Sequence, residues 1–347
     1  MNYPCIDILE RKVGVDYPPL VIAEIGINHE GDIAVAKQMV DAAKRAGCEV
    51  IKHQTHIIAD EMIPLARRVM PGNANESIYD IMSRCALSEE EERELQSYVQ
   101  RQNMIFLSSP FSRAAVDRLI AMNIPAFKIG SGECNNYPLI EYIAAFKKTI
   151  ILSTGMNNVA SVEKAVNIIR KYKTPFALMQ CTSIYPTPYD KVRLGSLGVL
   201  RKAFPDAVIG FSDHSLSHYP CMGAVAKGAS LLERHFTDHK GRQGPDIEVS
   251  MDEQELKELL LASKVIWQCR GGSKTILKEE RPTIDFAYAC VVSIRNIKKG
   301  EKLSRSNLWV KRPGTGEILA EEYEALLGKK VLVDIACDVQ LERAMVE

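Results

Sequence analysis

Two lysines and a set of serines lie inside or directly after apolar, β-branched runs of the 347-residue sequence, and not on charged helix faces. A lysine ammonium supplies positive charge and a serine hydroxyl supplies a hydrogen-bond donor, so several of each around one point suit a phosphate group. The alternative is that the lysines lie on solvated loops without a chemical role. The candidate phosphate-binding residues are Lys52, Ser109, Lys128, Ser131, Ser153 and Ser212.

Two histidines lie near the ends of the last two apolar runs: His214 in residues 207–215 and His235 in residues 230–237. Neutral imidazoles at adjacent strand ends can share a divalent metal, with water and substrate in the open positions. Glu24 is the nearest candidate for a third ligand or for a base acting on bound water. The assignment is not unique, because a strand histidine is often only a structural group and other histidines are available, namely His29, His53 and His56.

Glu133 ends the run KIGSGE, five residues after Lys128. A carboxylate beside a phosphate group is unfavourable unless it transfers protons, and neighbouring negative charge would raise its pKa into a useful range. The alternative is a salt bridge from Glu133 to Lys128 or Lys52. Cys134 and Cys181 are weaker candidates for a nucleophile, because the sequence offers no base matched to either thiol.

Eight short apolar runs alternate with longer amphipathic stretches, which is the pattern of βα units that build a parallel sheet. One stretch, EEEERELQSYVQRQN, follows Ser88, a typical helix N-cap. Eight units in roughly 250 residues predict an α/β fold of the (β/α)₈ TIM-barrel type, whose chemistry gathers at the C-terminal strand ends. A doubly wound open sheet is the alternative. The predicted strands span residues 19–26, 49–56, 105–111, 126–133, 149–156, 176–186, 207–215 and 230–237.

Two segments depart from this alternation. Residues 60–87 have no strand pattern, are long for a barrel loop and contain PGNANES, so we expect a functional loop over the barrel mouth. Residues 273–287 are polar, follow two glycines and are predicted to be a linker. The domain prediction is therefore a catalytic barrel over residues 1–272 and a small β-rich domain over residues 288–347.

The composition excludes several classes of protein. Lys+Arg and Asp+Glu are equal at 44 each and no long basic run occurs, so we expect no nucleic-acid partner. The N-terminal residues have no apolar core of signal-peptide length, and no run approaches the roughly 18 apolar residues of a membrane span. The nine cysteines are scattered without a CxxC pair. We therefore expect a cytoplasmic protein without disulfides and without a membrane partner.

With these residues identified, the sequence resembles the bacterial sialic acid synthase (N-acetylneuraminate synthase) family. The resemblance implies a TIM barrel followed by a C-terminal antifreeze-like (SAF) domain. The matching motifs run through nearly the whole chain and are specific as a set, although GFSDH or STGM alone would be weak. They are AEIGINHEGD, VIKHQTH, MPGNANESIYDIM, SPFSRAA, KIGSGECNNYPLI, ILSTGM, CTSIYPTPYDKVRLG, GFSDHS, LERHFTDHKGRQGPD and NLWVKRPGTG.

The resemblance implies an enzyme that condenses phosphoenolpyruvate with open-chain N-acetylmannosamine and water, giving N-acetylneuraminate and phosphate by C–O bond cleavage. It implies a divalent metal on His214 and His235, with Mn²⁺ as the first choice and Mg²⁺ or Co²⁺ as alternatives. Such a metal would act as a Lewis acid on the sugar aldehyde.

The same resemblance implies roles for individual residues. The lysines and serines named above match the phosphoenolpyruvate-binding positions. Arg312 matches an arginine that contacts the N-acetyl group in the partner subunit's site, which implies a homodimer whose small domains close each other's sites. The catalytic set that we expect is Glu133, Glu24, Lys52 and Lys128. The sugar-binding set is Gln54, Asn73, Glu133, Tyr185, Asp246 and Arg312.

Three alternatives remain open on the sequence. Legionaminate and pseudaminate synthases share the barrel motifs and use 2,4-diacetamido sugars. A non-catalytic sugar-phosphate-binding protein would keep the fold but would release no phosphate. An aldolase that forms a lysine Schiff base fits poorly with two lysines surrounded by serines of phosphate-binding type.

Overall fold

The computed structural model describes residues 3–72 and 75–347, and the chain divides into two compact units, Met1–Gly271 and Gly272–Glu347. In the first unit, parallel strands close a barrel in the order β10-β3-β4-β5-β6-β7-β8-β9. Each predicted apolar run contains one of these strands, so the TIM-barrel prediction is confirmed and the open-sheet alternative is wrong. The strands are β3 (Leu20–Gly26), β4 (Val50–Thr55), β5 (Ile105–Pro110), β6 (Ala126–Ile129), β7 (Thr149–Ser153), β8 (Phe176–Cys181), β9 (Val208–Asp213) and β10 (Leu231–His235).

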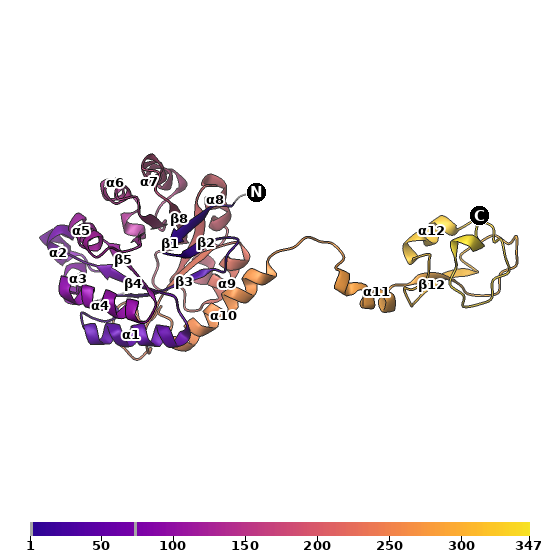
Figure 1. Cartoon of the computed structure of the whole chain (residues 1–347), viewed down its shortest axis with the longest axis horizontal. Helices are drawn as coiled ribbons and strands as arrows, with labels where there is room; N and C mark the ends of the chain where they lie inside the picture. Colours follow the sequence, from indigo (N-terminus) through magenta and orange to yellow (C-terminus); the bar gives the residue numbers. More distant parts are fainter. Residues whose placement is uncertain (1–2, 73–74) are drawn as a thin grey trace. The chain divides into compact units, whose positions relative to one another are not determined.

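Helices surround this barrel (Figure 1). The Ser88 hydroxyl accepts a hydrogen bond from the Glu91 backbone and the Glu91 side chain returns to Ser88, which is the capping box that starts α4. The helices of the unit are α1 (Ile33–Ala46), α2 (Ile58–Glu61), α3 (Ile78–Cys85), α4 (Glu89–Arg101), α5 (Arg113–Ala121), α6 (Tyr137–Ala144), α7 (Val159–Lys171), α8 (Ser196–Ala203), α9 (Tyr219–Ala226) and α10 (Glu253–Cys269).

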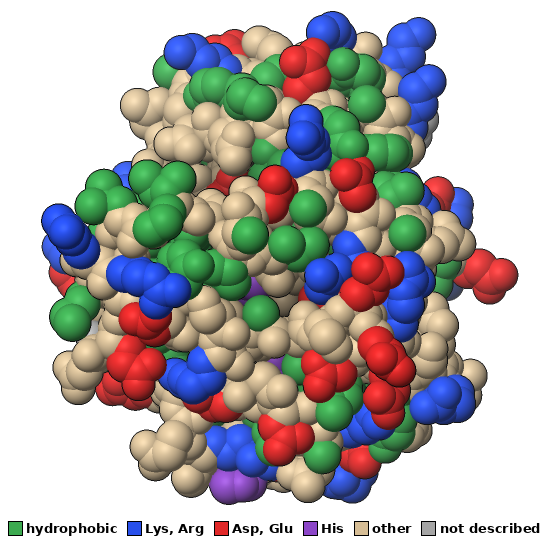
Figure 2. Space-filling model, turned by 90° about the vertical axis from the view of Figure 1, so that its left-hand side faces the viewer, with side chains coloured by type: hydrophobic (Ala, Val, Ile, Leu, Met, Phe, Trp, Pro, Cys, Tyr) green, Lys and Arg blue, Asp and Glu red, His purple; other side chains and the backbone are tan. Residues whose placement is uncertain are grey.

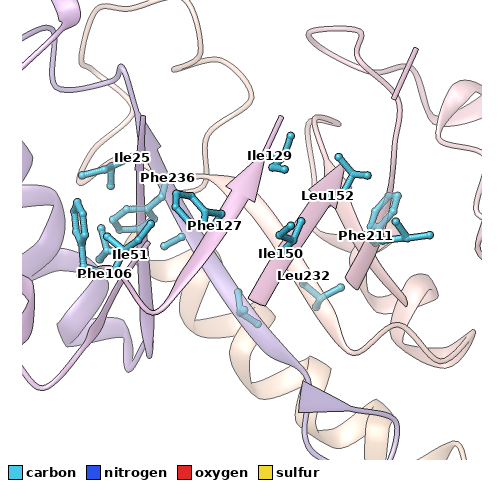
Figure 3. Close-up of a cluster of buried hydrophobic side chains, with 14 of the residues drawn as sticks. Ile25, Ile51, Phe106, Phe127, Ile129, Ile150, Leu152, Phe211, Leu232 and Phe236 are labelled. Carbon is cyan, nitrogen blue, oxygen red and sulfur yellow. The ribbon is translucent and has the colours of Figure 1, made fainter. Parts of the chain in front are cut away.

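The barrel strands alternate between two apolar shells, because successive side chains of a strand point to opposite faces. One shell fills the barrel interior and includes Leu20, Ile22 and Val50. The other lies between strands and helices, where Ile25, Ile51 and the aromatic side chains seen in Figure 3 pack. This two-residue period also decides which polar side chains at the strand ends reach the barrel interior.

A hairpin of β1 (Cys5–Ile8) and β2 (Arg11–Gly14) precedes the barrel and was not predicted. Its side chains Ile6, Ile8 and Val13 are buried in the same cluster as the interior residues at the N-terminal ends of the strands. The Thr149 hydroxyl at the start of β7 donates a 2.9 Å hydrogen bond to the carbonyl of Asp7. The hairpin therefore closes the barrel at the end opposite to the predicted active site.

Shortening a buried side chain of this hairpin is expected to destabilise the protein. Ile8 is 0% exposed, so Ile8→Ala should lower the free energy of unfolding by about 2–5 kcal/mol through lost burial and the remaining cavity. Leu9, the next residue, is 66% exposed, and Leu9→Ala should change that free energy by less than about 0.5 kcal/mol. Urea unfolding of both variants measures the difference. Equal free energies of unfolding would contradict the packing of the hairpin against the barrel end.

The second unit contains α11 (Arg281–Ala287), β11 (Cys290–Ser293), β12 (Leu308–Lys311) and α12 (Tyr323–Leu326). The two strands pair antiparallel, and the rest of the predicted β structure is reduced to isolated bridges such as Val331 with Val346. Part of the predicted linker is helical: Pro282 occupies the first turn of α11, and Arg281 and Asp285 form an i,i+4 ion pair at 2.7 Å.

Acidic and basic side chains are interspersed over the face of the molecule in Figure 2, in keeping with their equal numbers. Within residues 3–72 and 75–347, no helix combines the length and apolar character needed to cross a lipid bilayer.

Candidate active site

A cavity of about 550 Å³ opens at the C-terminal ends of the barrel strands. Strand residues that face the barrel interior line its floor, because they continue the inward face of the apolar interior residues at intervals of two, as Lys52 follows Val50. The structure thus brings most predicted site residues to one place. They are Glu24, Lys52, Gln54, Ser109, Lys128, Ser131, Ser153, Tyr185, Ser212, His214, His235 and Asp246.

Both candidate lysines are buried in ion pairs at the cavity floor. Lys128 Nζ lies 3.0 Å from Glu233 Oε1, and Lys52 pairs with Glu24. Lys52 also donates a 3.2 Å hydrogen bond to the Ser109 hydroxyl. The alternative of solvated lysines is therefore wrong, and the two carboxylates keep the floor close to charge balance.

The charges at the cavity floor favour the ionised forms of Lys52 and Glu233. Burial alone lowers the pKa of Lys52, but the charges of Glu233 and Glu24 raise it, and the net pKa lies above its ordinary value. Burial opposes ionisation of Glu233, yet Lys128 and Lys52 outweigh it and lower its pKa to about 2. A protonated Lys52 suits an anion and disfavours the Schiff-base alternative, which needs a neutral amine.

Hydroxyl groups around the lysines include one without a protein partner. The Ser212 hydroxyl donates to Glu233 at 3.1 Å, and the Ser131 hydroxyl accepts from the Gly155 backbone at 3.0 Å. The Ser153 Oγ is buried and has no hydrogen-bond partner among the residues that the structure describes. An unsatisfied donor that lines the same cavity as two lysines is suited to an anionic ligand oxygen.

The two candidate metal ligands lie close together on β10 and just beyond β9. The ring centroids of His214 and His235 are 5.4 Å apart, and burial lowers the pKa of His214 to about 3, so this ring is neutral. His235 Nδ1 is buried without a hydrogen-bond partner in the described residues, and Asp246 Oδ2 lies 3.7 Å away. Two neighbouring imidazoles, one of which has a nitrogen without a partner, fit a divalent cation.

Glu24 does not complete this pair. Its carboxylate is engaged by Lys52 and accepts a 2.8 Å hydrogen bond from Gln54 Nε2. Within residues 3–72 and 75–347, no three His, Cys, Asp or Glu side chains converge on a point that could hold a metal ion. In the free protein Glu24 is thus engaged by Lys52 and Gln54, and its role as a third ligand stays a prediction.

Three other histidines do not contribute to a metal pair. The ring of His53 faces outward from β4 and stacks on His29, with centroids 5.3 Å apart. His56 stacks on Phe111 and its Nδ1 lies 2.9 Å from Glu61. None of these rings lines the cavity in the described residues, so their role as alternative ligands is not supported.

The outer part of the cavity is formed by the long loop predicted to lie over the barrel mouth. Pro71, Gly72 and the α3 residues Ile78, Ile81 and Met82 line it, which supports the prediction for this segment. Asn73, the predicted sugar-binding residue of this loop, lies outside the described residues. Arg312 belongs to the second unit, where its guanidinium carbon is 5.7 Å from the Phe286 ring centroid.

Glu133 stands beside the cavity. The lining includes Gly130, Ser131 and Gly132 but does not extend to Glu133. Its Oε2 accepts a 2.6 Å hydrogen bond from Asn136 Nδ2. Burial raises its pKa, Asn136 lowers it, and the charge of Glu61 raises it further. The raised pKa has the predicted direction, although burial is its main cause in the free protein.

The alternative salt bridge of Glu133 with Lys128 or Lys52 is not formed, because Glu233 and Glu24 hold these lysines. Glu233 is a functional candidate that the sequence places at the end of the same predicted strand as His235, but to which it assigns no role. It lies two residues before His235 on β10 and therefore shares its inward face, whereas Arg234 between them points outward and pairs with Asp213. The two-residue period was the signal that could have identified it.

Comparisons with known proteins cover both units of the chain. The NeuB family profile matches residues 39–275 and the SAF domain profile matches residues 288–347. An uncharacterized protein of Methanocaldococcus jannaschii is 37% identical over 331 residues, covering 95% of each chain. The N,N'-diacetyllegionaminic acid synthase of Campylobacter jejuni is 36% identical, covering 89% of this chain and 95% of its own length.

A solved structure is similar as well. The N-acetylneuraminic acid synthetase of Leptospira borgpetersenii, in complex with citrate, superposes with a TM-score of 0.75 at 29% identity. The match covers 81% of this chain and 95% of that one.

Proposed function

The chain belongs to the NeuB family and is an enzyme that forms C–C bonds in nonulosonic acid biosynthesis, and from that premise we propose that its substrates are phosphoenolpyruvate and N-acetylmannosamine. The products are N-acetylneuraminate and phosphate. One observation carries this proposal: two buried lysines and several hydroxyl groups converge on the floor of the barrel cavity, where an anion can be bound on several sides.

In the proposed reaction, C3 of phosphoenolpyruvate bonds to the aldehyde carbon of the sugar, and the aldehyde oxygen takes up a proton to become a hydroxyl. Water adds at C2 and gives up a proton. The C2–O bond then breaks, so phosphate leaves with the bridging oxygen. Lys52 and Lys128 hold the departing phosphate and stabilise its charge, together with Ser109, Ser131, Ser153 and Ser212. Glu133 accepts the proton of the attacking water, and its raised pKa makes it a stronger base than an ordinary carboxylate.

We assign the metal site to His214 and His235, with Mn²⁺ as the first choice and Mg²⁺ or Co²⁺ as alternatives. The unpartnered Nδ1 of His235 and the neutral ring of His214 support this assignment. A divalent metal held there would supply a Lewis acid for the sugar aldehyde. Water and substrate would complete its coordination, since the described protein groups offer two ligands.

The sugar is proposed to lie toward the outer cavity, against Gln54, Tyr185 and Asp246. Asn73 and Arg312 complete the proposed sugar-binding set. Arg312 is proposed to act in the site of the other subunit of a homodimer, which gives the small C-terminal domain the role of closing that site.

A second acceptor has specific support. The relative from Campylobacter jejuni is named as a synthase of N,N'-diacetyllegionaminic acid, and a 30% identical relative from Helicobacter pylori is named as a pseudaminic acid synthase. The same floor residues serve either reaction. The alternative is therefore the same chemistry on a 2,4-diacetamido sugar.

Phosphate release from phosphoenolpyruvate tests this proposal, with N-acetylmannosamine and the 2,4-diacetamido sugars as separate acceptors. We expect release that is fastest with N-acetylmannosamine, disappears after chelation and returns with Mn²⁺. Release only with a diacetamido sugar would move the enzyme to legionaminate or pseudaminate synthesis. No release with any acceptor would overturn the proposal.

A further inference from the structure

Behind the cavity floor, on the outward face of β4 and β5, a group of polar side chains is buried between the strands and the helices. We call this group the rear cluster. Its central carboxylate, Glu92 of α4, is 0% exposed. The rear cluster consists of Glu92, Arg118, His53, Thr55 and Ser108.

The contacts of the rear cluster link two helices to two strands. Glu92 Oε2 lies 3.4 Å from Arg118 Nη1 of α5 and accepts a 3.4 Å hydrogen bond from the Thr55 hydroxyl of β4. The hydroxyls of Thr55 and Ser108 are 2.7 Å apart and join β4 to β5. His53 Nδ1 lies 3.8 Å from Glu92 Oε1.

The strand residues of the rear cluster alternate with residues of the cavity floor. In β4, Lys52 and Gln54 face the cavity while His53 and Thr55 face Glu92. In β5, Ser109 faces the cavity and receives the Lys52 hydrogen bond, while its neighbour Ser108 belongs to the rear cluster. Any shift of the outward side chains therefore moves the inward ones through the same backbone.

A contribution to folding stability does not explain why these polar side chains are buried. Glu92 Oε1, Arg118 Nε and both ring nitrogens of His53 are buried without hydrogen-bond partners in the described part of the chain. Burial raises the pKa of Glu92 to about 7 despite the nearby Arg118, and burial lowers the pKa of His53 well below its ordinary value. Well-packed apolar residues would be at least as stable as such an incompletely paired group.

We propose that Glu92 is a positioning residue that, through Thr55, Ser108 and Arg118, holds the ends of β4 and β5 so that Lys52 and Ser109 meet the phosphate of the substrate. This inference rests on the proposed function, because it names phosphoenolpyruvate as the substrate whose binding depends on Glu92. Glu92 itself touches neither substrate.

The test compares Glu92→Leu with a control on the same helix. Gln96, one turn further along α4, is 8% exposed and donates a 2.8 Å hydrogen bond to the Met122 carbonyl, away from β4 and β5. Gln96→Leu therefore removes a buried polar contact of α4 without touching the rear cluster. Both full-length variants are assayed below the melting temperature of the less stable one.

We expect Glu92→Leu to raise the KM for phosphoenolpyruvate by about 10-fold or more, because a displacement of about 1 Å in a site can cost 10²-fold. The KM for the sugar should stay within about 2-fold. Glu92→Gln, which keeps an acceptor for Thr55, should restore most of the affinity, and Gln96→Leu should leave both KM values unchanged.

An active wild type with an unchanged KM in Glu92→Leu, or an equal rise in Gln96→Leu, would overturn the positioning role alone. A wild type that does not turn over phosphoenolpyruvate would instead reject the proposed function, and this inference with it.

Discussion

Lys128→Met is expected to lower kcat/KM for phosphoenolpyruvate by about 10³-fold. Methionine fills a similar volume but removes the charge that faces the leaving phosphate, and one lost donor of this kind typically costs 10²–10³-fold. The buried Glu233 also loses its 3.0 Å partner. A buried carboxylate that has lost its ion-pair partner should therefore destabilise the fold by about 3–5 kcal/mol.

A double variant separates these two effects. Lys128→Met combined with Glu233→Gln leaves two neutral side chains at the cavity floor, so most of the lost stability should return while turnover stays low. Urea unfolding and steady-state kinetics are measured on both single variants and on the double variant. If restoring stability also restored turnover, Lys128 would be a structural residue only.

Glu133→Gln is expected to lower kcat by about 10²–10⁴-fold while the fold is retained, as for other general acid–base residues. The pH dependence has a definite sign. A base acts when deprotonated, and burial raises the pKa of Glu133 above its ordinary value. Activity should therefore rise with pH through that raised pKa, and this acid limb should vanish in Glu133→Gln. Near wild-type turnover in the variant would remove Glu133 from proton transfer.

Asn136→Asp is the matched control for this assignment. Asn136 donates to Glu133 Oε2 and its Oδ1 also caps α6, a role that aspartate can keep. Replacing the donor with a carboxylate should raise the pKa of Glu133 further, so the acid limb should move to higher pH with the plateau rate largely kept. An unmoved limb would assign the observed pKa to another group.

The barrel and most of its cavity followed from local pattern. Apolar, β-branched runs predict strands, and a lysine or serine inside such a run is costly to bury without a partner, which is why Lys52, Lys128 and Ser153 were predicted as site residues. The helix N-cap at Ser88 was equally local. These features depend on neighbours within a few residues, so one sequence is enough to recognise them.

Other features depend on contacts between distant segments. The pairing of Glu24 with Lys52 depends on the register between β3 and β4, and the pairing of Glu233 with Lys128 joins β10 to β6, which are not neighbours in the barrel. Ile8 of the hairpin is buried because it packs against interior residues of strands that are distant in the sequence. His53 follows Lys52 directly in β4, so it points outward while Lys52 points inward. A short apolar run does not show which of two neighbouring residues faces the barrel interior.

The bond that breaks in phosphoenolpyruvate decides whether the cavity floor acts as we propose. The enzyme is given phosphoenolpyruvate labelled with ¹⁸O at the bridging position, together with the acceptor sugar, and both products are analysed by mass spectrometry. We predict that the label leaves with inorganic phosphate, because Lys52 and Lys128 hold phosphate as C2–O breaks. Label retained in the sugar acid would mean that the P–O bond breaks, and would contradict the mechanism built on these two lysines.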